Sequence, residues 1–124
     1  MVKIKDCVLI ESFKCNEEDS LVDVAKKLRE ITLRHIFVVD DMDYPKGIIS
    51  VVDMNNRVVA EGKNPVGLKA KDIMSRVEEI ADVDEDVSEF LKKALEKNRV
   101  LSPVVKDNKM VGIISAHQLI KHSS

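Results

Sequence analysis

Two short stretches of the sequence place polar side chains at a spacing that suits a ligand. The stretch "GIISVVD", residues 47–53, sets an acid, Asp53, three positions after Ser50; "GIISAHQ", residues 112–118, repeats its first four letters but ends on Gln118. A serine at a strand-to-helix corner can cap the helix, and the helix N-terminus suits a phosphate. A carboxylate in the first helical turn can accept hydrogen bonds from the two hydroxyls of a ribose.

The same spacing also has a purely structural interpretation, because S-x-x-D is an ordinary capping box. The two roles are compatible, since a capping residue can still face a ligand. Gly47 has no side chain, so a ligand or a neighbouring strand can approach it closely. In the second copy Gln118 offers one neutral carbonyl, and we expect it to bind a hydroxyl more weakly by about 1–2 kcal/mol, or about 5–30-fold.

The repeated phrase belongs to a longer internal repeat. "VKIKDCV" (2–8) matches "LKAKDIM" (68–74) 66 positions later, and "FVVD" (37–40) matches "PVVK" (103–106) at the same offset. "GIIS" recurs after 65 positions because the preceding turn is one residue shorter in the second copy, and repeats normally diverge at such turns. We therefore predict two homologous modules, residues 1–62 and 66–124, with a linker at 63–67.

Each module shows the same order of secondary-structure signals, β-α-β-β-α, which predicts an α+β (or α/β) fold. The first helix of each module opens at an N-cap, Ser20 or Asp86, and continues with apolar residues at helical spacing. The apolar strands do not alternate, which indicates burial on both faces. The expected extended stretch, helix, two strands and second helix lie at 7–14, 21–31, 36–39, 47–50 and 51–61, then at 76–81, 87–95, 103–105, 110–115 and 116–122.

This order of elements, the "PVV" strand, the hairpin into "GIIS", the acid three residues later and the lead-in "KDIM" together resemble the CBS (cystathionine β-synthase-type) domain. The resemblance covers almost the whole chain, in both copies. It implies that two CBS modules pack through their sheets as a pseudo-twofold pair. Clefts at that interface are expected to bind an adenosine-containing ligand: AMP, ADP, ATP or S-adenosylmethionine. It further implies a regulatory sensor that forms a homodimer, requires no cofactor and is not an enzyme.

The resemblance also implies two groups of ligand contacts, each drawn from both modules. Two departures weaken the match to nucleotide-binding members: the usual first-strand threonine is absent, and Phe37 replaces the usual proline before "VV". In the second group a glutamine replaces the acid, although that group carries more positive charge. The better site is expected to comprise Ile48, Ile49, Ser50, Asp53, Ile80, Arg99, Val100 and Leu101, and the weaker one Lys14, Arg34, His35, Ser115 and Gln118.

Composition excludes several other classes of function. The 124 residues carry a formal net charge of -2, which gives no basic surface for nucleic acid. No apolar run approaches the roughly 20 residues that a membrane span needs. Cys7 and Cys15 fit neither a redox pair nor a metal site, so we expect reduced thiols in a cytoplasmic protein without a bound metal.

Three hypotheses about function follow. The first is a regulatory module that binds an adenosine ligand and passes the change to an unidentified protein in trans. The alternative is a ligand-free dimerisation or scaffold module, favoured by Gln118, the missing threonine and Phe37. Catalysis would need a nucleophile and a base within reach, and Cys15 with His35 is the only conceivable pair.

Overall fold

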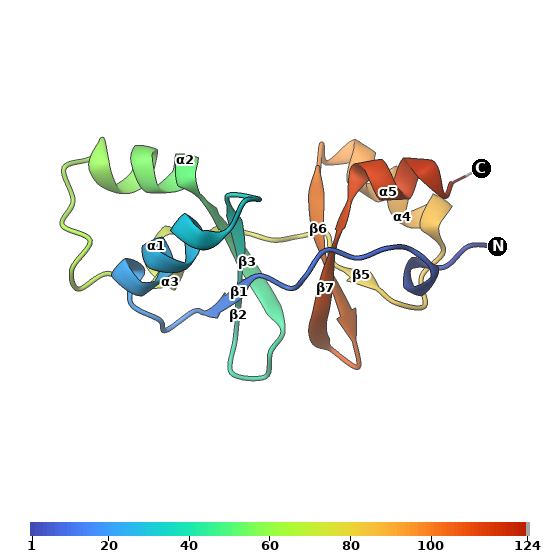
Figure 1. Ribbon diagram of the computed structural model, residues 1–124, viewed down its shortest axis with the longest axis horizontal. Helices are drawn as coiled ribbons and strands as arrows, with labels where there is room; N and C mark the ends of the chain where they lie inside the picture. Colours follow the sequence, from blue (N-terminus) through green and yellow to red (C-terminus); the bar gives the residue numbers. More distant parts are fainter. Residues whose placement is uncertain (124) are drawn as a thin grey trace. The chain divides into compact units, whose positions relative to one another are not determined.

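The computed structural model describes residues 1–123 and places the chain in two compact units. The central unit is Phe13–Val77, and the split unit joins Met1–Ser12 to Glu78–Ser124. Each unit consists of one sheet with helices packed on it (Figure 1). The predicted α+β fold is therefore confirmed.

The central unit contains a four-stranded sheet in the order β1-β2-β3-β4. Strands β1 and β2 are parallel, whereas β2 with β3 and β3 with β4 are antiparallel. Three α-helices and a π-helix, η2, accompany the sheet. The bounds are β1 Lys14–Asn16, α1 Leu21–Glu30, β2 His35–Val39, β3 Pro45–Ser50, α2 Val51–Met54, η2 Asn55–Val59, α3 Ala70–Ile73 and β4 Ser75–Arg76.

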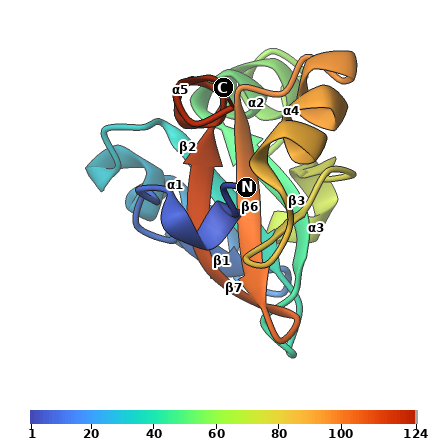
Figure 2. The ribbon, with the colours of Figure 1, turned by 90° about the vertical axis from the view of Figure 1, so that its right-hand side faces the viewer.

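The split unit contains a three-stranded sheet in the order β5-β6-β7, with β5 parallel and β7 antiparallel to β6. Helices α4 and α5 lie side by side on this unit (Figure 2). The bounds are η1 Ile4–Asp6, β5 Ala81–Asp82, α4 Val87–Glu96, β6 Leu101–Lys106, β7 Lys109–Ser115 and α5 Ala116–Lys121.

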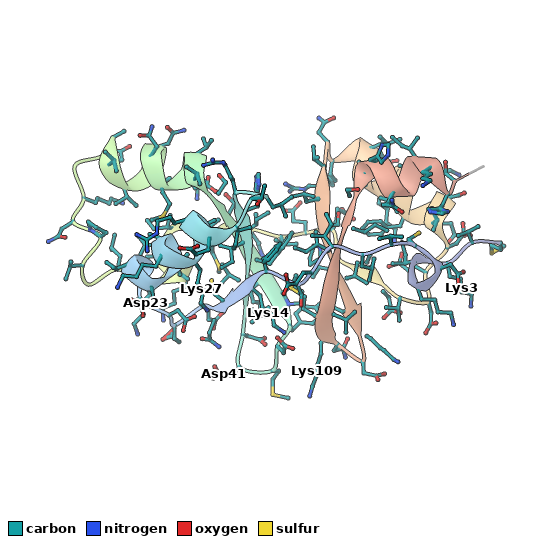
Figure 3. All side chains as sticks on the ribbon, in the orientation of Figure 1. Lys3, Lys14, Asp23, Lys27, Asp41 and Lys109 are labelled. Carbon is teal, nitrogen blue, oxygen red and sulfur yellow. The ribbon has the colours of Figure 1, made fainter. Side chains whose placement is uncertain are left out.

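The first helix of the central unit forms as its sequence predicts. The hydroxyl of Ser20 accepts a hydrogen bond of 3.2 Å from the backbone N–H of Asp23, which caps α1. The apolar stripe Leu21, Val24 and Leu28 is buried in the core of the unit, whereas Asp23 and Lys27 lie on the exposed side (Figure 3). In the split unit Asp86 caps α4 in the same way, by accepting from the N–H of Glu89.

The opening segment of each repeat lies in the unit that is built mainly from the other repeat. In the central unit, backbone N–H groups of Leu21 and Ala70 donate to the carbonyls of Leu68 and Asp19, at 2.8 and 3.0 Å, so that the opening segment of the second repeat holds α1 of the first. The equivalent residues of the split unit, each 66 positions away, make the same bonds, from Val87 to Val2 at 2.9 Å and from Ile4 to Glu85 at 3.0 Å. The compact units thus differ from the predicted modules 1–62 and 66–124, which describe the sequence repeat.

This exchange corrects the predicted extended stretches at 7–14 and 76–81. Each was predicted as one strand, but each has two parts with different partners. Ile10 pairs with Ile113 of β7, and only at Lys14 does β1 begin. Likewise β4 pairs with β3, whereas β5 begins at Ala81 and pairs with β6. Local patterning could not separate the two parts, because partner choice depends on contacts distant in sequence.

The two glycines of the repeated phrase make room for these exchanged segments. A Cβ added at Gly47 would lie 2.5 Å from Sδ of Met74 and 2.8 Å from the carbonyl oxygen of Ser75. At Gly112 the added Cβ would lie 3.0 Å from the Cβ of Leu9. Of the two interpretations of Gly47, close approach of a strand is therefore the one that the structure displays.

The second helix of the central unit departs from regular geometry. The sequence predicts one helix over 51–61, but α2 passes into the π-helix η2 after four residues. Gly62 ends the segment in the left-handed region with φ 66°, as expected for a C-terminal glycine. None of the helices in residues 1–123 has the length and apolar character needed to cross a bilayer.

Candidate functional site

The corner between β3 and α2 holds the serine and the acid of the first repeat. The backbone N–H of Ser50 donates to Oδ2 of Asp53 at 2.8 Å, and the Ser50 hydroxyl donates to the same oxygen at 3.1 Å. The N–H of Asp53 donates in return to Ser50 Oγ at 3.1 Å. The capping box is therefore present, and it fixes the direction of a carboxylate whose side chain is still 22% exposed.

Arg57, one turn further along, also contacts this carboxylate. Its Nε lies 3.8 Å from Oδ1 of Asp53, and its Nη1 donates to the carbonyl of Ile73 at 2.9 Å and of Met74 at 3.4 Å. The guanidinium thus links the acid to the end of α3, which belongs to the exchanged segment. Sequence reasoning did not identify Arg57, although its i,i+4 spacing from Asp53 was a usable signal.

The matching corner of the split unit has a simpler network. The hydroxyl of Ser115 accepts a bond of 3.2 Å from the N–H of Gln118 and so caps α5. The side-chain oxygen Oε1 of Gln118 is buried and accepts no hydrogen bond within residues 1–123. The serine of the repeat therefore keeps its capping role, while the residue that replaces the acid leaves a polar atom unsatisfied.

Each corner is flanked within its own unit by the residues that precede the central strand. In the central unit His35 lies opposite Ser50 in the register of β2 and β3, and the N–H of Val51 donates to the carbonyl of Arg34 at 3.3 Å. In the split unit Leu101 lies opposite Ser115, and the N–H of Ala116 donates to the carbonyl of Val100 at 2.8 Å. The structure thus brings Arg34 and His35 next to Ser50, and Val100 and Leu101 next to Ser115.

The isoleucines of the first phrase lie on opposite faces of β3. Ile49 is fully buried in the core of the central unit, whereas Ile48 is half-buried and lies on the other face, because strand side chains alternate. Of these two predicted contacts, only Ile48 has a side chain exposed enough to touch a ligand directly. Val100 is 70% exposed, and Ile80 and Arg99 are half-buried, all three in the split unit.

Lys14, predicted as a contact of the weaker site, is already engaged within the central unit. Its Nζ donates to both carboxylate oxygens of Asp43, at 2.7 and 2.9 Å, with both side chains about one-third exposed (32% and 33%). A paired, half-buried ammonium is less free to bind a phosphate than an exposed one. This pair instead ties β1 to the turn between β2 and β3.

Cys15 and His35 do not form a nucleophile–base pair. The parallel register of β1 and β2 sets Cys15 opposite Val38, three residues beyond His35 and so about 10 Å along the strand. Burial, with a smaller contribution from Asp19, raises the pKa of the Cys15 thiol to about 12. Nδ1 of His35 lies 2.9 Å from the carbonyl oxygen of Leu33, which orients the ring.

No group of three or more histidine, cysteine, aspartate or glutamate side chains is placed to hold a metal ion in the part of the chain that the structure describes. The two cysteines are free, and both are buried.

Comparison with known proteins places these features in one family. The CBS domain model matches residues 4–60 and 70–124. An uncharacterized protein of Methanopyrus kandleri is 34% identical over 104 residues, which are 83% of this chain and 53% of that protein. The chain therefore spans about half the length of this curated relative.

Solved structures show the same fold. Hypoxic Response Protein I is 20% identical, with a TM-score of 0.80 and 98% of both chains covered. The domain pair of protein MJ0100, crystallised in complex with 5′-methylthioadenosine and S-adenosyl-L-methionine, is 25% identical, with a TM-score of 0.75, 98% of this chain and 94% of that chain covered. The two repeats of this sequence thus correspond to a known tandem arrangement.

Proposed function

Since this chain belongs to the CBS domain family, whose pairs are regulatory ligand-binding modules, we propose that it binds an adenosine-containing ligand: AMP, ADP, ATP or S-adenosylmethionine. The arrangement of Ser50 and Asp53 carries the proposal. A carboxylate held in direction by its capping box and still 22% exposed suits a pair of ribose hydroxyls.

The proposed contacts follow from the family resemblance. We propose a better group built on the acid, and a weaker group in which Gln118 replaces it. The side chain of Ile49 is fully buried, so we propose that it supports this group from the core of the central unit. The better group is Ser50, Asp53, Ile48, Ile49, Ile80, Arg99, Val100 and Leu101, and the weaker group is Ser115, Gln118, Lys14, Arg34 and His35.

Ligand binding would act by a shift of population. A ligand that binds one conformation more tightly raises the share of that conformation, and a partner protein reads the change. We propose that the chain works as a homodimer in the cytoplasm, acts on a protein target in trans and has no catalytic activity of its own. Two free cysteines agree with a reducing compartment.

Calorimetric titration of the purified chain with each of the four ligands tests the proposal. We expect saturable binding and a higher melting temperature. Asp53→Ala should weaken binding by about 10–150-fold, because hydrogen bonds to a charged group contribute about 1.5–3 kcal/mol. Gln118→Ala should weaken it by about fivefold or less, as expected for a neutral bond. Absence of binding by all four at millimolar concentration would reject the proposal.

The second candidate is a ligand-free dimerisation or scaffold module. One observation favours it: both oxygens of the Asp53 carboxylate already have partners, Oδ2 in the capping box and Oδ1 beside Arg57. Lys14 is likewise paired, with Asp43. A purified chain that is dimeric by light scattering, releases no nucleotide on denaturation and keeps its melting temperature with ligands would favour this candidate.

A further inference from the structure

A hollow on the helical face of the central unit includes neither Ser50 nor Asp53. Its volume is about 270 Å³, and its lining comes from α1, from α2 and from Arg34, which directly precedes β2. All of its lining residues belong to the central unit. They are Ala25, Leu28, Arg29, Arg34, Val51 and Met54.

The lining combines an apolar floor with cations that are free to bind. Leu28 is buried in the core, and Ala25 and Met54 are half-buried beside it. Within residues 1–123 the guanidinium of Arg34 has neither a hydrogen-bond nor an ion-pair partner. Nε of Arg29 lies 3.6 Å from Glu30, but both side chains are more than 70% exposed (73% and 77%), so that pair contributes little. None of the six lining residues is acidic.

The backbone fixes Arg34 at the edge of this hollow. Its φ of 60° lies in the left-handed region, which residues other than glycine adopt infrequently. The N–H of Arg34 donates to the carbonyl of Ile31 at 3.1 Å, and its own carbonyl accepts from Val51 at 3.3 Å. The backbone of Arg34 is therefore held in place between the end of α1 and the start of α2.

The split unit shows that the fold does not require these arginines. By the repeat offsets, Arg29 corresponds to Leu95 and Arg34 to Val100, which are 56% and 70% exposed. Ala25, the smallest lining residue, corresponds to Leu91. The equivalent place in the split unit thus carries apolar side chains only, and the positive charge belongs to the central unit alone.

We propose that the hollow binds a small amphipathic anion, with an apolar body against Leu28 and Met54 and a carboxylate or phosphate head on Arg29 and Arg34. Arginine presents a planar fork of donors that matches both heads. Pockets for drug-sized ligands measure about 300–1,000 Å³, so the ligand is smaller than these. Arg29 and Arg34 are the only charged residues of the lining, and both are positive, which is why we assign an anion.

Calorimetric titration of the whole chain with sodium octanoate tests the proposal. We expect saturable binding of one octanoate per chain, and no saturable binding of octylamine, which has the same body but a positive head, or of acetate, which has the head alone. Ala25→Leu, which imports the residue of the split unit, should fill the hollow and abolish binding. Arg29→Gln should weaken binding about twofold to fivefold, as expected for an exposed charge pair.

Arg76→Gln is the matched control, because Arg76 is an exposed arginine of the same unit on β4 and does not line the hollow. It should bind octanoate as the unchanged chain does, and so should Asp53→Ala, because Asp53 does not line the hollow; Arg34 is the one residue that the hollow shares with the proposed adenosine contacts. Thermal denaturation of every variant verifies that it folds.

Equal binding of octylamine, or unchanged octanoate binding by a folded Ala25→Leu chain, would overturn the proposal. A third result would also overturn it: the chain is a dimer, octanoate does not bind, and Ala25→Leu dissociates the dimer. A second copy of the chain would then cover the hollow.

Discussion

In the central unit the corner after the repeated phrase carries Asp53 and Arg57, whereas the equivalent positions of the split unit are Gln118 and His122. Asp53 completes a capping box with Ser50, and Arg57 adds an ion pair to Asp53 and two hydrogen bonds to the end of α3. In the second, one capping bond is made and the glutamine oxygen stays unsatisfied. One backbone corner thus supports a charged network in one unit and a neutral one in the other.

The same contrast extends to the helical faces, where Arg29 and Arg34 of the central unit stand in place of Leu95 and Val100. The parallel and antiparallel pairing around the central strand, the serine caps and the exchanged segments agree between the units, while the charges differ. The repeat therefore preserves the residues that build the fold and varies the charged residues near the proposed ligand contacts.

The largest effect should come from the glycines that admit the exchanged segments. Gly47→Ala should destabilise the chain by about 2–3 kcal/mol, because the added Cβ would meet both a side chain and the backbone oxygen of Ser75 within 2.8 Å. Gly112→Ala should cost only about 1 kcal/mol, since Leu9 and Ile10 lie at 3.0 Å or beyond. Urea denaturation measures the loss of stability in both variants. Equal losses would contradict the expected difference between Gly47 and Gly112.

Much of this agreement could be predicted from the sequence. Helical stripes, caps at Ser20 and Asp86 and the order of elements are local signals, and the structure confirms them. The two-part character of 7–14 and the roles of the two glycines could not be predicted, because they depend on which segment pairs with which sheet.

For the candidate site, the sequence identified the capping pair but not Arg57 or the Lys14–Asp43 pair. It also could not assign Ile48 and Ile49 to different faces before the register of β3 was known. Side-chain pairing between distant segments is a property of the folded state, and no pattern within one segment encodes it.

The next effect concerns Arg57. Arg57→Ala should destabilise the chain by about 1.5 kcal/mol, because it removes a charged donor from the carbonyls of Ile73 and Met74 and a partner from Asp53. His122→Ala, the matched change in the split unit, should cost no more than about 0.5 kcal/mol. Arg57→Lys should recover little, since lysine lacks the fork. A loss at His122 as large as that at Arg57 would contradict this interpretation.

A smaller effect concerns the pH dependence of stability, to which Cys15 in β1 contributes and its equivalent in β5, Ala81, does not. The folded state keeps the thiol protonated, because burial raises its pKa to about 12 from 9.0. The unfolded thiol loses its proton first, so stability falls as pH rises above 9. We expect a loss of about 0.8 kcal/mol between pH 8 and 9.5.

Cys15→Ala should remove most of this slope; Cys7, whose pKa is also raised by burial and then by Asp6, accounts for a remainder. Denaturation curves at the two pH values give the slope, and an unchanged slope in Cys15→Ala would show that another group titrates.

The smallest effect tests whether the acid can be restored to the split unit. Gln118→Asp should raise stability by about 0.5 kcal/mol at pH 7, because a carboxylate in the first turn of α5 can complete the capping box with Ser115 and interacts favourably with the helix N-terminus. The change also removes the buried, unsatisfied Oε1. Gln118→Ala is the control, since it removes that oxygen without adding charge. If Ala stabilises as much as Asp, the gain comes from the lost amide, and the difference between the two corners is one of burial and not of charge.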